Sequence, residues 1–119
     1  MKVNAENLAG AALDWAVAKC EGVLAFGYRT DGERFAVEDS DGQVEGFMPS
    51  TDWAIGGPII EREGIAIYPD SAPDMPEIKW SADAEDALCW GGPTPLVAAM
   101  RAYVVSKLGS EVEIPEELK

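Results

Sequence analysis

The chain has 119 residues, and its 22 acidic side chains against 9 basic ones give a formal net charge of −13. This charge argues against nonspecific binding to DNA, RNA or an anionic membrane, because all three are themselves negative. The sequence contains no histidine and only two cysteines. These counts exclude histidine-based catalytic triads and dyads, histidine-ligated metals and a cysteine-rich zinc site.

Length and composition predict a single domain over residues 1–119, because a chain of this size, 47% hydrophobic, can bury one core. No apolar run approaches the ~20 residues needed to cross a bilayer. The first residues also lack the pattern of a signal peptide. We therefore expect a cytoplasmic protein in which Cys20 and Cys89 are reduced thiols.

Apolar residues recur at helical spacing from about Leu8 to Glu21, and Gly22 then suits a left-handed helix end. Residues 23–48 predict a meander of up to three antiparallel strands, the first over residues 23–28. Its turns are expected at the two Asp-Gly pairs, 31–32 and 41–42.

The middle of the chain is rich in proline and glycine. Residues 47–58 predict a loop, and Pro58 then suits the first position of a short helix over 59–63. A buried strand over 65–68, an extended loop over 69–76 and a strand over 77–80 follow. We expect residues 81–94 to be irregular.

A second long helix is predicted from Pro95 to Leu108, with Thr94 as its N-cap and Gly109 beyond its end. This helix has few polar residues, so we expect it to be the central, covered element. Residues 112–114 alternate and favour an edge strand that folds back. The expected fold class is α+β, with two long helices plus a short one packed on a small, mainly antiparallel sheet.

At two places, residues 53–58 and 90–93, a tryptophan and a glycine pair lead through proline into a helix start. Glycines before a helix N-terminus let backbone N–H groups approach an anion, which the helix dipole also favours. Neighbouring hydroxyl, arginine and indole groups would complete a site for a small anionic or nucleotide-like ligand. The candidate ligand-binding residues are Ser50, Thr51, Asp52, Trp53, Gly56, Gly57, Trp90, Thr94 and Arg101.

Each candidate also has a purely structural interpretation. The glycines would permit tight turns and the indoles would cover the core. Asp52 would either be a carboxyl group with a raised pKa or accept hydrogen bonds from the loop backbone. The spacing matches no known phosphate-binding loop, and residues 38–42 fail the calcium-loop pattern. We therefore expect no cofactor and no metal.

Six acids and a single base, Lys79, lie in residues 69–90. This segment is the best candidate for an interaction face with a basic protein partner, although it would equally serve as a solvated loop.

Three segments together resemble the NinX-like family of phage proteins: residues 12–22, 49–65 and 92–118. This family consists of short acidic chains of tailed phages and prophages. The resemblance implies a phage or prophage accessory protein and carries over no activity, cofactor or catalytic residue. The matching positions are Ser50, Thr51, Asp52, Trp53, Gly56, Gly57, Pro58, Pro93, Thr94, Pro95 and Arg101.

Three functional hypotheses follow. The first is a non-enzymatic accessory protein of the host cytoplasm, expected to be a homodimer, that acts by binding a partner. The second is a small-molecule binding domain or enzyme that uses the two loops, which requires Asp52, Trp53, Thr94 and Arg101 to converge on one pocket. The third is a DNA mimic, which requires acids along one elongated face.

Overall fold

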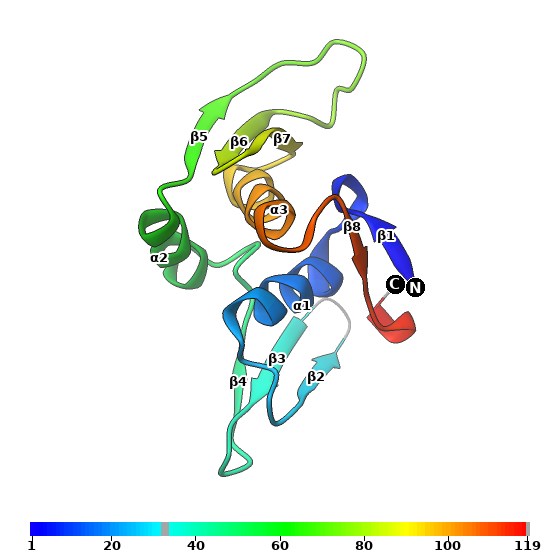
Figure 1. Ribbon diagram of the computed structural model, residues 1–119, viewed down its shortest axis with the longest axis vertical. Coiled ribbons are helices and arrows are strands. Elements are labelled where there is room, and N and C mark those ends of the chain that lie inside the picture. The colour runs from blue at the N-terminus through cyan, green and yellow to red at the C-terminus, as the bar shows by residue number, and fades with distance from the viewer. Residues whose placement is uncertain (32–33, 119) are drawn as a thin grey trace.

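The computed structural model describes residues 1–31 and 34–118 (Figure 1). Its helices are α1 (Gly10–Glu21), α2 (Trp53–Glu63) and α3 (Pro95–Leu108), with short 3-10 helices η1 (Ala5–Asn7) and η2 (Glu116–Leu118). The strands form three small antiparallel sheets. These are β1 (Lys2–Asn4) with β8 (Glu111–Glu113); β2 (Tyr28–Asp31), β3 (Arg34–Glu38) and β4 (Val44–Gly46); and β5 (Ala66–Pro69), β6 (Trp80–Ala84) and β7 (Ala87–Gly92).

Helix α3 is the central element, as predicted. It packs against the β5–β6–β7 sheet and against α1 and α2, while α1 also contacts β3 (Figure 1). Its residues from Ala98 to Val104 are all buried. The expected α+β class is confirmed, but three small sheets replace the single one that was expected. No helix in the described part of the chain is long and apolar enough to span a membrane.

The first predicted helix is confirmed with a shifted start. Helix α1 begins at Gly10, and Leu8 lies before it, fully buried. Gly22 ends the helix with a φ of +72°, the left-handed conformation expected of it.

The three-stranded meander is confirmed, but its first strand begins at Tyr28, and residues 23–27 lie outside it. In the expected turn at 41–42, Gly42 has a φ of +79°. The Asp39 carboxylate accepts hydrogen bonds from the backbone of Asp41 and Gln43, each at 2.9 Å. The acids of this segment therefore shape the turn. The other expected turn includes Gly32, which lies outside the described residues.

The predicted start of the second helix was wrong, because residues 53–58, expected within the loop over 47–58, are helical; residues 59–63 are helical as predicted. Helix α2 begins at Trp53, and Pro58 lies inside it. Gly56 serves packing rather than a turn, since a Cβ atom there would lie 2.5 Å from the Pro49 carbonyl oxygen and 2.7 Å from Leu96 Cδ2. Tertiary contact with α3 therefore outweighs the local preference of glycine and proline against helix.

The prediction that residues 81–94 are irregular was also wrong, because β6 and β7 form a hairpin there. Its two-residue turn places Glu85 at a φ of +51°. The sequence contains no strand signal here, because β6 buries the small residues Ser81, Ala82 and Ala84 instead of β-branched ones.

Helix α3 runs from Pro95 to Leu108 as predicted, with the Thr94 hydroxyl accepting a hydrogen bond from Val97 N–H at 3.1 Å. The expected edge strand near the C-terminus is β8, which pairs with β1 and places Val112 opposite Val3.

Candidate functional site

The loop that leads into α2 is tied to α1 by a buried carboxylate. Asp14, which is 1% exposed, accepts a hydrogen bond from the Ser50 backbone N–H at 2.9 Å. Burial raises the pKa of Asp14 to about 6, although the hydrogen bonding from Ser50 opposes the shift. Ser50 is itself 2% exposed, and its hydroxyl oxygen has no hydrogen-bond partner within the described structure. Ser50 therefore lies inside the fold and away from solvent.

The first turns of α2 and α3 pack against each other. Gly56 of α2 contacts Leu96 in the first turn of α3. Each helix start, however, is capped by its own side chain: Asp52 accepts a hydrogen bond from Ala54 N–H at 2.9 Å, and Thr94 does the same for Val97. Of the two roles considered for Asp52, its carboxylate therefore has the second, that of accepting a hydrogen bond from the backbone. These caps occupy backbone donors that an anion would need.

The remaining candidates on α2 and just before it lie at or near the surface. Trp53 is 55% exposed, Thr51 is exposed and Gly57 is half-buried. Three cavities within the described residues are lined by side chains other than Asp52, Trp53 and Thr94.

Trp90 and Arg101 are the candidates that share a cavity. Both line a groove of about 770 Å³ between η1, the loop of residues 70–79 and strand β7. Arg101 is 8% exposed and donates from Nε to the Leu8 carbonyl and from Nη1 to the Gly91 carbonyl, each at 2.9 Å. Its burial lowers the pKa of the guanidinium, and the charge of Glu6 opposes the shift.

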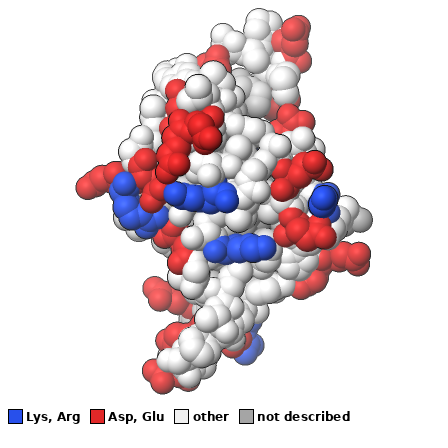
Figure 2. Space-filling model, viewed as in Figure 1, with Lys and Arg blue, Asp and Glu red and all other residues white. Residues whose placement is uncertain are grey.

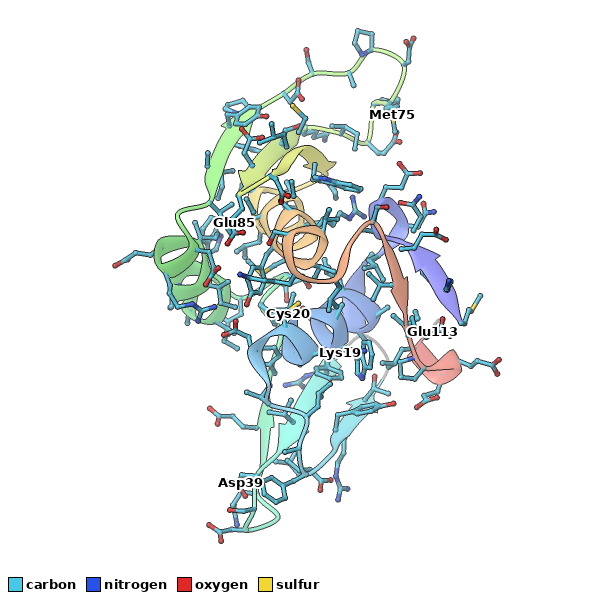
Figure 3. The ribbon with its side chains drawn as sticks, viewed as in Figure 1. Lys19, Cys20, Asp39, Met75, Glu85 and Glu113 are labelled. Atoms are coloured by element: carbon cyan, nitrogen blue, oxygen red, sulfur yellow. The ribbon has the colours of Figure 1, made fainter. Side chains whose placement is uncertain are left out.

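Apolar side chains are exposed along this groove. Leu88 of β7 is 60% exposed and Met75 is 45% exposed. Met75 lies on the loop between β5 and β6, at the end of the molecule opposite Asp39 (Figure 3). Neither residue was predicted from the sequence, because nothing in the sequence indicates that an apolar residue in a polar segment will stay exposed.

Carboxylates also line the groove. Glu6, Asp70 and Glu77 are all exposed there, and the described lining contains no lysine. Arg101 is its single basic side chain, so the lining carries more negative than positive charge.

The loop of residues 70–79 is held in place by hydrogen bonds. The Asp70 carboxylate accepts from the Ser81 hydroxyl at 2.7 Å, and Asp70 N–H donates to the Lys79 carbonyl at 3.0 Å. The loop also packs closely on β7, where a Cβ atom at Gly91 would lie 2.8 Å from Ile78 Cγ2. Glycine at this position therefore lets the loop form one wall of the groove.

Beside the groove, Asp83 organises an irregular part of the β6–β7 pair. Its carboxylate accepts from Cys89 N–H at 2.8 Å and from the Tyr68 hydroxyl at 3.0 Å. Cys89 is exposed and has a φ of +63°, which is uncommon for a residue with a side chain. Both cysteines are free thiols, and burial raises the pKa of Cys20 to about 11.

Arg62 of α2 is engaged in ion pairs. Its guanidinium binds Glu21 through two hydrogen bonds, at 2.5 and 3.0 Å, and Glu63 through a third at 2.8 Å. Burial opposes ionisation of Glu21, but hydrogen bonds from Arg62 and Tyr103 hold its pKa below the usual range. Arg62 therefore joins α1 to α2 as part of an ion-pair cluster.

Comparison with protein families gives a match to the family described as Bacteriophage P22, NinX, over residues 4–107. The match spans both helix starts and the whole groove region from Glu6 to Arg101. A comparison with curated proteins found no match. The chain therefore belongs to this phage NinX family, which confirms the resemblance seen in the sequence.

Proposed function

We propose that this member of the NinX family is a phage or prophage accessory protein that acts in the host cytoplasm by binding a protein partner with a basic surface. The net charge of −13 supports this choice, because opposite charge speeds encounter and helps to select the partner.

The groove is the observation that carries the proposal. It combines two exposed apolar side chains, Met75 and Leu88, with three exposed carboxylates, Glu6, Asp70 and Glu77. Apolar contact supplies affinity at protein interfaces, and surrounding charges set which partner is accepted. Two of these carboxylates belong to the acidic segment 69–90.

A small anionic ligand remains the second candidate. Trp90 and Arg101 share the groove, which supports it. Asp52 and Thr94 cap their own helices and Trp53 lies outside the groove, so this candidate now rests on Trp90 and Arg101 alone.

A DNA mimic receives less support from the face shown in Figure 2. Acidic side chains there lie in separate groups, with uncharged surface between them. A mimic would need a continuous row of charges spaced like phosphates.

We include a homodimer in the proposal. The exposed side chains of Val23 and Phe26 offer apolar surface outside the groove. Light scattering tests this part, and a mass equal to that of one chain would remove it.

The direct test of the binding function is affinity capture from phage-infected cells. We expect a basic protein to be retained at low salt and released at about 0.5 M salt, since screening weakens exposed charge contacts. A tag-only control defines the background. Recovery of nothing above that background, or only of salt-insensitive acidic proteins, would overturn the proposal.

A further inference from the structure

The guanidinium of Arg101 is a buried cation that makes no direct contact with a carboxylate of the described residues, although the charge of Glu6 acts on it. Its Nε and Nη1 donate to backbone carbonyls, and no acceptor within residues 1–31 and 34–118 is found for Nη2. No carboxylate of the described residues forms an ion pair with it. Buried charges in proteins are normally paired. Because Arg101 lines the groove, a ligand there can supply the missing anion.

The chemistry of the groove selects the kind of anion. A planar guanidinium pairs well with both carboxylate and phosphate. Three carboxylates, Glu6, Asp70 and Glu77, line the same groove and would repel a multiply charged phosphate more strongly than a single carboxylate. A monoanionic carboxylate is therefore favoured over a nucleotide.

The rest of the lining indicates what the carboxylate is attached to. Trp90, Met75 and Leu88 offer apolar contact, and the acidic side chains favour a positively charged neighbour. The C-terminus of a polypeptide can provide a carboxylate, an apolar side chain and a positively charged side chain within a few residues. A second copy of this chain is a poor occupant of the groove, because the apolar surface assigned to the homodimer, Val23 and Phe26, lies outside it.

We propose that the groove binds the C-terminal segment of the partner protein. The terminal carboxylate pairs with Arg101, an apolar last residue contacts Trp90 and Leu88, and preceding lysines or arginines face Glu77 and its acidic neighbours. This proposal rests on the proposed function and names the part of the partner that is recognised.

Synthetic peptides test it without altering Arg101, which also supports the fold. The probe is a fluorescein-labelled six-residue peptide with two lysines and a terminal leucine, measured by fluorescence anisotropy. Its free-acid form is expected to bind about 10-fold more tightly than the same peptide with a terminal amide, because the amide removes a charge-assisted pair. Replacing the terminal leucine by serine, or the lysines by glutamates, is also expected to weaken binding.

Protein variants then locate the binding site. Leu88→Ser and Glu77→Lys are expected to weaken binding of the free-acid peptide about 5-fold each. Val44→Ser and Glu45→Lys are the matched controls, since both residues are exposed on β4 and neither lines the groove. The controls are expected to bind within about 2-fold of the unaltered protein.

Three results would overturn the inference. The first is no peptide binding at 1 mM, because weaker binding would not matter. The others are equal affinity for the acid and amide forms, and weaker binding by the control variants but not by the groove variants. Each of these leaves the proposed function standing if capture from infected cells still yields a basic partner. Failure of that capture overturns the proposed function itself.

Discussion

The Arg101 side chain in α3 reaches the backbone carbonyl of Leu8, 93 residues earlier in the chain, with 2.9 Å between Nε and the oxygen. The same guanidinium binds the Gly91 carbonyl at the end of β7. One side chain therefore links the residue that follows η1 to strand β7.

Replacing this arginine tests its structural role. Arg101→Leu leaves the Leu8 and Gly91 carbonyls without their donor, so we expect a loss of about 2–4 kcal/mol in the free energy of unfolding. Urea denaturation followed by circular dichroism measures this value. A loss below about 0.5 kcal/mol, the range of ordinary surface changes, would show that the two bonds do not hold the fold.

The buried carboxylate of Asp14 predicts an unusual pH dependence. Its pKa is about 6 in the folded protein, against 3.8 for an unperturbed aspartate, so the folded state holds this proton more tightly. The contribution of Asp14 to stability therefore improves as pH falls through about 6 and levels off below about 4. Asp14→Asn keeps an acceptor for Ser50 N–H without the charge.

We expect Asp14→Asn to unfold at a higher urea concentration than the unaltered protein at pH 7.5. Its free energy of unfolding should be larger by at most about 3 kcal/mol. The difference should shrink as pH falls from 7 to about 4.5. A stability difference that stays constant over this range would contradict the assignment. Asp14→Ala leaves Ser50 N–H unpaired, so it should be less stable than the unaltered protein at pH 7.5 and at about pH 4.5 alike.

Two adjacent glycines in α2 should respond in opposite ways to alanine. Gly56→Ala places a methyl group against the Pro49 carbonyl, so we expect a loss of about 1–3 kcal/mol from overpacking. At Gly57 the nearest atom to a new Cβ is Trp53 Cε3 at 4.0 Å, an ordinary contact. Gly57→Ala should therefore be neutral or stabilising by up to about 1 kcal/mol. Thermal unfolding of the two variants side by side measures both effects, and equal shifts would be inconsistent with the packing described.

The ion-pair cluster around Arg62 gives a further comparison. Arg62→Met removes the bonds to Glu21 and Glu63, and since Arg62 is 51% exposed we expect a loss of only about 1 kcal/mol. The pKa of Glu21 is lowered in the fold, so this contribution is present above pH 4.5 and is lost as pH falls below it. Arg29→Met, at a more exposed pair with Glu38, is the control and should cost less. An equal cost for both variants at pH 7 would contradict the role given to Arg62.

Sequence patterns predicted the elements whose signals are local. Helix α3 was found from Thr94, Pro95 and Gly109, and the turn before β4 from Asp41 and Gly42. The start of α2 was predicted wrongly. Glycine is required at position 56 by its close approach to Leu96, a residue far along the chain, and local sequence does not reveal that approach. The β6–β7 hairpin was missed because the buried residues of β6 are serine and alanine, which give no strand signal.

The candidate site was predicted only in part. Trp90 and Arg101 were selected for their residue type, and the groove contains both. Glu6 was not selected, because its proximity to Arg101 depends on η1 folding back against α3. Met75 and Leu88 become recognisable only once their exposure is known.

Hydrogen exchange of the captured complex tests the central claim, that the groove is the surface by which this protein binds its partner. Protection is expected to appear on binding in residues 70–78 and 88–93, which form the loop and the strand of the groove. Protection confined to β2, β3 and β4, with residues 70–78 and 88–93 exchanging as in the free protein, would contradict the claim.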